Sequence, residues 1–145
     1  MKRKQKVEIV VETDRSGPLS WLRRFAEKCL EAEKLERKGC LLIVLVDNTK
    51  IKEINRQFFN RDRSTDVIAF SYDENEESWG EIVISVDQAE QQARDYDVSF
   101  KNELARLTVH GILHLAGYKD NTADLKSEMH QKEDDYLTKF HELTD

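Results

Sequence analysis

The stretch 104-LARLTVHGILHLAGYKD-120 joins a mostly apolar segment to a turn that carries polar side chains. Apolar residues occur on most sides of its first part, which predicts a helix that is buried nearly all round. His110 and His114 are four residues apart, so their side chains project from the same face of that helix. Gly117 suits the left-handed position that ends a helix, after which the chain can reverse and bring Asp120 back toward the two histidines.

These side chains are of the types that bind a metal ion. His110, His114 and Asp120 on one ion would leave a coordination position open for water, as catalytic sites require. We expect one zinc ion per chain, and beyond the water that the zinc would hold the sequence leaves the catalytic residues unidentified. A pair of satisfied core histidines is the alternative, because HxxxH alone recurs by chance in helices. The full spacing HxxxHxxGxxD favours the metal site. His130 is a fallback ligand, although we expect it on a helix surface.

The segments around this helix alternate between strand and helix patterns. We expect strands at 6–12, 40–46, 66–72 and 79–85. We expect helices from Pro18 to about Arg37, at 49–59 after an Asn48 cap, at 86–96 after a Ser85 cap, from Ser99 to Ala116, and from Thr122 onward. This order predicts an α+β fold with a single layer of a small four-stranded mixed sheet, packed with about five helices. The metal site would lie on the buried central helix and the turn after it.

Length and composition indicate one domain that spans residues 1–145 and can bury a core. Charged residues make up 36% of the chain and hydrophobic residues 39%. No apolar run approaches the roughly 20 residues that cross a bilayer, and no apolar signal segment follows the basic N-terminus. We therefore expect a cytoplasmic protein without a membrane partner. Cys29 and Cys40 are expected to be reduced.

The net charge of −6 argues against a generic nucleic-acid binder, and we expect no binding to DNA. The charge is unevenly distributed, however. Residues 50–63 carry five Lys/Arg against two Asp/Glu, whereas residues 73–97 carry one against nine. A polyanion such as RNA could dock on the basic part, or these charges could belong to solvated helix faces; both interpretations stay open.

Two motifs of this chain resemble those of the YbeY family, bacterial endoribonucleases of ribosomal RNA maturation. HGILHLAGYKD is similar to the family's HGxLHLxGYDH, and STDVIAFSY followed by WGEIVIS is similar to its TDVLSFP and GDIxIS pattern. Asn55 also matches, and the resemblance extends over residues 44–136. It implies that His110 and His114 are zinc ligands. The family's third ligand is a histidine where this chain has Asp120, so we expect a harder and more anionic third ligand.

A second departure from the family pattern lies at Phe59, where the family has an arginine implicated in RNA cleavage. Arg56, Arg61 and Arg63 are nearby and are candidates for contacts with RNA. For each of them, a solvated surface arginine is the ordinary alternative. The remaining matches are expected to be structural: Thr65 and Asp66 as a strand-entry cap, and Met129 as a core residue.

Three functions follow as hypotheses. The resemblance implies a metal-dependent, single-strand-preferring endoribonuclease that acts on the 3′ end of small-subunit ribosomal RNA and in ribosome quality control. Its partners would be RNA, the small ribosomal subunit and the proteins of that subunit. The alternative is a non-catalytic, zinc-containing ribosome-assembly or RNA-binding factor, which Phe59 and the acidic net charge favour. A metallopeptidase is disfavoured, because HExxH enzymes use the glutamate as general base and this chain has Gly111 there.

Overall fold

A four-stranded mixed sheet forms the centre of the computed structural model, which describes residues 6–14, 17–61, 65–72 and 77–144. Its strand order is β1-β2-β4-β3. The first three of these strands are parallel neighbours, and β3 pairs with β4 in antiparallel orientation at the edge. The strands are β1 (Lys6–Glu12), β2 (Cys40–Val46), β3 (Val67–Ser71) and β4 (Ser78–Ser85).

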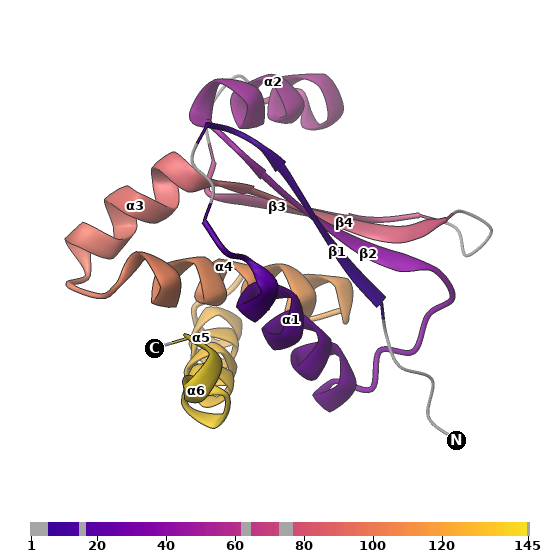
Figure 1. Cartoon of the computed structure of the whole chain (residues 1–145), viewed down its shortest axis with the longest axis vertical. Coiled ribbons are helices and arrows are strands. Elements are labelled where there is room, and N and C mark those ends of the chain that lie inside the picture. The colour runs from indigo at the N-terminus through magenta and orange to yellow at the C-terminus, as the bar shows by residue number, and fades with distance from the viewer. Residues whose placement is uncertain (1–5, 15–16, 62–64, 73–76, 145) are drawn as a thin grey trace.

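Helices cover both faces of this sheet (Figure 1). In the described part of the chain they are α1 (Ser20–Ala32), α2 (Asn48–Phe59), α3 (Val86–Asp95), α4 (Phe100–Leu115), α5 (Ala123–Lys139) and the four-residue α6 (His141–Thr144). α2 lies over one face, α1 and α4 lie under the other, and α5 packs on α4 away from the sheet. The expected α+β fold with a four-stranded mixed sheet is therefore confirmed.

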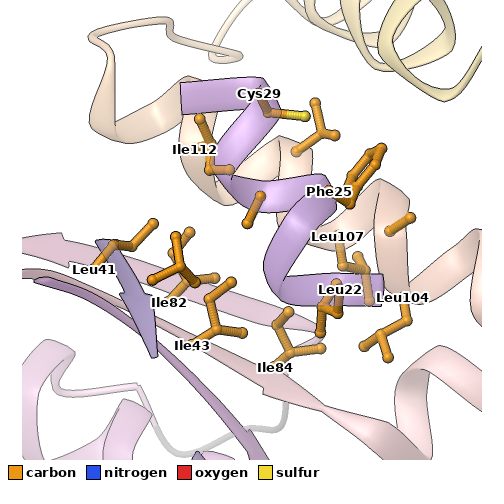
Figure 2. Close-up of a cluster of buried hydrophobic side chains, with 14 of the residues drawn as sticks. Leu22, Phe25, Cys29, Leu41, Ile43, Ile82, Ile84, Leu104, Leu107 and Ile112 are labelled. Carbon is orange, nitrogen blue, oxygen red and sulfur yellow. The ribbon is translucent and has the colours of Figure 1, made fainter. Parts of the chain in front are cut away.

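The larger part of the core lies between the sheet and helices α1 and α4. Figure 2 shows Ile82 and Ile84 of β4 pointing toward these helices. Val83, between them, packs into the smaller cluster under α2, as the two-residue alternation of a strand requires. β2 is buried on both faces in the same way, with Ile43 in the larger cluster and Val44 in the smaller one. The central strands thus hold α4 firmly from one side.

Gly111 allows α4 to lie close to β4. A Cβ atom at this position would lie only 2.8 Å from Cγ2 of Ile82. Because carbon atoms in contact are normally about 3.5–4.0 Å apart, a larger residue would push the helix away from the sheet. The glycine between the two histidines therefore sets the depth at which their helix is seated.

The predicted helix limits needed two corrections. α1 ends at Ala32 rather than near Arg37, because Lys34 adopts a left-handed conformation and the Leu35 amide bonds to the Leu30 carbonyl. The cap of α2 is Asp47 rather than Asn48, and its carboxylate accepts from the Lys50 amide at 2.8 Å. The predicted side-chain caps of the three later helices are confirmed, at Ser85, Ser99 and Thr122.

Two further expectations concern the cysteines and the membrane. Cys29 and Cys40 are both free. Within the described ranges, no helix combines the length and the apolar character that crossing a bilayer requires.

Candidate active site

The C-terminal end of α4 is closed by a glycine turn. Gly117 has φ of 101°, a conformation that side chains with a Cβ rarely adopt. Its amide donates to the carbonyl of His114, and the amide of Tyr118 donates to the carbonyl of Leu113, each at 3.0 Å. These two bonds make the Schellman motif, which turns the chain back over the last turn of the helix. Asp120 consequently returns to the helix face that carries the histidines.

Three side chains converge at this point, as the sequence predicts. The Nε2 atoms of His110 and His114 are 3.0 Å apart, and Oδ2 of Asp120 lies 3.6 Å from the first and 3.5 Å from the second. Ligands of a tetrahedral ion with bonds of about 2.0–2.1 Å are separated by roughly 3.3 Å. The three separations bracket that value, so this donor set fits a zinc-sized ion without rearrangement.

Glu133 of α5 orients one of the candidate ligands. Its Oε2 atom lies 2.7 Å from Nδ1 of His110, while its Oε1 atom accepts from Arg106 at 3.1 Å. Because a carboxylate only accepts hydrogen bonds, Nδ1 carries the proton and Nε2 presents its lone pair toward His114 and Asp120. This carboxylate–histidine pair is the arrangement that orients histidine ligands in metal sites.

The charges around His110 also affect its protonation. Burial disfavours the imidazolium, but the hydrogen bond and charge of Glu133, followed by the charges of Asp120 and Asp66, outweigh it and raise the pKa of His110. A proton therefore competes strongly with a metal ion for Nε2 of His110. The same negative charges also favour a metal cation bound at this atom. Both effects point to a site that attracts positive charge.

Glu133 was not among the site residues predicted from the sequence. It follows His110 by 23 residues and belongs to no local motif. A signal was nevertheless present, because Met129, Glu133 and Leu137 form the buried face of α5, and a carboxylate on an otherwise apolar helix face is rarely there without a partner.

The turn that carries Asp120 is held from two sides. The ammonium group of Lys132 donates to the Tyr118 hydroxyl at 2.7 Å and to Glu33, the C-cap residue of α1, at 3.0 Å. The Tyr136 hydroxyl also bonds to Glu33. This network ties the ligand turn to α5 and α1, and it restricts the freedom of the segment next to Asp120.

A cavity of about 410 Å³ opens beside His110. Asp66 lines it, and the Asp66 carboxylate accepts from the side chain of Gln92 at 3.2 Å while its carbonyl accepts from the Ser85 amide. His130 lines the cavity too, but its side chain is 65% exposed, and it is outside the cluster of three candidate ligands. The expectation that His130 lies on a helix surface is confirmed.

The candidate RNA contacts lie elsewhere. Arg56 and Arg61 are exposed, on or just after α2, and neither lines the cavity. α2 covers the sheet face opposite α4, so these cations are not brought together with the histidines. Arg63 is outside the described residues. Phe59, which the resemblance predicts to replace a family arginine, is 44% exposed.

The remaining expected roles concern Met129 and Gly111. Met129 is 2% exposed and belongs to the large core cluster, so the structural interpretation is confirmed. Gly111 is buried against Ile82 and offers no side chain to the histidine face. It therefore cannot supply the general base of an HExxH peptidase, which agrees with the argument from sequence.

Comparisons with known proteins show the family of this chain. The family model described as Endoribonuclease YbeY matches residues 2–141. The Endoribonuclease YbeY of Chlorobium limicola is 44% identical over 102 residues, which are 70% of this chain and 71% of that protein. The Bacillus mycoides protein of the same name is 33% identical over 148 residues, covering 92% of this chain and 95% of its own.

A solved structure extends the comparison to the fold. The solution structure of TM1509 from Thermotoga maritima superposes with a TM-score of 0.64 at 30% identity, and the match covers 94% of this chain and 92% of that one. The family model spans nearly the whole chain, and the cluster of His110, His114 and Asp120 lies within the region that it matches. This chain therefore belongs to the YbeY family and is an endoribonuclease, a hydrolase.

Proposed function

We propose that this endoribonuclease cleaves single-stranded RNA in a zinc-dependent reaction at the 3′ end of small-subunit ribosomal RNA, and that it acts in ribosome quality control. The observation that carries the proposal is the convergence of His110, His114 and Asp120 beside a cavity, in a chain of the YbeY family. The small ribosomal subunit and its proteins would be its partners, in the cytoplasm.

The chemistry divides between the metal and the chain. A bound zinc ion would supply Lewis acidity toward a phosphoryl oxygen. Glu133 keeps the proton of His110 on Nδ1, and Arg106 keeps Glu133 in place, so the ligand lone pairs point at a common centre. We assign Arg56 and Arg61 to the RNA backbone, because exposed guanidinium groups attract phosphates without reading sequence.

Cleavage of a labelled single-stranded RNA tests this proposal. Wild type, His114→Ala and the control His141→Ala, which alters an exposed histidine of α6, would be purified in parallel and their bound metal counted. We expect wild type and the control to cleave, and His114→Ala to lose both metal and activity. The duplex of the same sequence should be cleaved more slowly. Equal cleavage by all three proteins would mean a contaminating nuclease and would contradict the proposal.

The exposed Phe59 supports a second candidate function, that of a non-catalytic factor, because an aromatic side chain stands where the family has a catalytically implicated arginine. A non-catalytic ribosome-assembly factor would bind RNA or small subunits without cutting them. If fully metallated wild type binds but leaves free RNA and subunit RNA intact, this second function replaces the first.

A further inference from the structure

The cavity beside His110 has carboxylates on its polar side. Asp66, Glu103 and Glu133 line it from three different elements: the segment before β3, then α4, then α5. Arg106, the one Lys or Arg side chain among its lining residues, is engaged with Glu133 and Asp134. A phosphate group would therefore meet negative charge here, so the RNA backbone is excluded from the interior of the cavity.

Glu103 is the residue that this arrangement leaves unexplained. It is only 2% exposed, and the groups that act on its carboxylate are the charges of Arg106, Asp66 and Glu133, with no hydrogen bond from the described residues among them. Burial is the main cause that raises its pKa, to about 7, and the charge of Arg106 only partly opposes it. A buried carboxylate without a donor is costly, because desolvation is not compensated. Its position on the cavity wall means that a bound molecule can provide the missing donor.

A second metal ion does not fit this requirement. Within the described ranges, the grouping of possible ligand atoms within 4.8 Å of one another comprises His110, His114 and Asp120, and it does not extend to Glu103. The carboxylates on the cavity wall are thus spread around the space instead of converging on one point.

Apolar and aromatic side chains also line the cavity, beside the polar Gln92 and the two histidines. Val98 and Leu107 contribute aliphatic surface, and the ring of Tyr96, which is 67% exposed, stands among the lining residues. A flat molecule with apolar faces and hydrogen-bond donors on its edge matches both kinds of wall. Nucleobases have this form, since every base has a face that stacks on aromatic rings and several carry an exocyclic amine.

We propose that this cavity is a nucleobase subsite, in which Glu103 accepts a hydrogen bond from the exocyclic amine of one base and Tyr96 stacks on that base. The inference rests on the proposed function and adds a base preference to it. A base placed here lies next to His110, so its phosphate is held at the mouth of the cavity near the metal ligands. Cytosine offers an N4 amine to the carboxylate, whereas uracil presents the O4 acceptor at the same place and is repelled.

The test compares the binding of two oligonucleotides that differ only in this group. Short single-stranded oligocytidine and oligouridine with 2′-O-methyl groups, checked for integrity after the measurement, would be titrated with the metal-loaded protein at pH 8 by fluorescence anisotropy. Wild type should bind oligocytidine roughly tenfold more tightly than oligouridine. Glu103→Gln should reduce this ratio to about one, because an amide both donates and accepts.

Two further variants separate the subsite from general effects. Glu31→Gln on the exposed face of α1 removes the same charge far from the cavity and should leave the ratio unchanged. Tyr96→Ala should weaken both oligonucleotides roughly tenfold and keep their ratio. Removing any negative charge from the protein raises its affinity for both oligonucleotides, because both are polyanions. This general gain cancels in the ratio of the two affinities.

The outcomes distinguish the two proposals. An unaltered ratio in Glu103→Gln, or a wild type that binds both oligonucleotides equally, overturns the nucleobase subsite while leaving RNA cleavage in place. Failure of metallated wild type both to bind and to cleave any single-stranded RNA overturns the proposed function and this inference with it. Thermal unfolding of each variant confirms that the altered protein is folded.

Discussion

Replacing Glu133 with Gln tests the role of the hydrogen bond to His110. The carboxylate lies 2.7 Å from Nδ1, and its side chain is only 7% exposed, so solvent screens the contact weakly. Partners of this kind contribute about 10- to 100-fold to metal affinity. Gln keeps an acceptor oxygen and loses only the charge. We therefore expect Glu133→Gln to lower zinc affinity by the smaller of these factors, about tenfold or 1.4 kcal/mol. Glu133→Ala, which also removes the acceptor, should approach the upper end.

The same substitution has a pH dependence with a definite sign. Glu133 raises the pKa of His110, so protons compete for Nε2 at a higher pH in wild type than in Glu133→Gln. The difference in zinc affinity between wild type and Glu133→Gln should therefore be largest at pH 8 and should become smaller as the pH falls toward 6. Zinc affinity would be measured at both pH values by competition with a chromophoric chelator.

A matched control lies on the same helix. Glu128→Gln makes the same chemical change at an exposed position of α5 and should bind zinc as wild type does. Equal zinc affinities for wild type and Glu133→Gln at pH 8 would refute the argument that this carboxylate orients the ligand. A loss of equal size in Glu128→Gln would show that net charge, and not the hydrogen bond, is responsible.

Three other variants test the ligand set, the packing and the buried carboxyl. Asp120→Ala should lower the bound metal well below the wild-type content in an elemental analysis; unchanged metal would mean that the third ligand is wrong. Gly111→Ala places a Cβ 2.8 Å from Ile82 and should cost about 1–3 kcal/mol in urea unfolding, whereas Gly17→Ala, with open space around it, should be nearly neutral. Burial raises the pKa of Glu103 from 4.5 to about 7, so its ionisation destabilises the fold as the pH rises through this range. Glu103→Gln should therefore equal wild type near pH 4 and exceed it by about 3 kcal/mol at pH 8, and equal stabilities at pH 8 would contradict this.

The sequence by itself determined those features that depend on neighbouring residues. The four-residue spacing puts His110 and His114 on one face of α4, because a helix turns every 3.6 residues. The left-handed conformation of Gly117 then returns Asp120 to that face. The caps at Ser85 and Ser99 are equally local, since a side-chain oxygen bonds to an amide three residues on.

Two predictions from the sequence were wrong at positions where local conformational preferences are weak. The end of α1 lies at Ala32 because Lys34 takes the left-handed position, and lysine has no strong preference for it that a sequence pattern reveals. Asp47 and Asn48 are both good capping residues, and the choice between them depends on Ser85 and Asp87, which bond to Asn48 from elsewhere in the chain.

Only the tertiary structure decided what surrounds the candidate metal ligands. Glu133 reaches His110 because α5 packs on α4, and the cavity wall formed by Asp66, Glu103 and Tyr96 exists because three elements meet there. Contacts of this kind depend on how helices are placed against one another, and no spacing within a single segment encodes that placement. The candidate metal ligands are therefore visible in one short motif, whereas the residues that orient them and shape the cavity come from segments far apart in the chain.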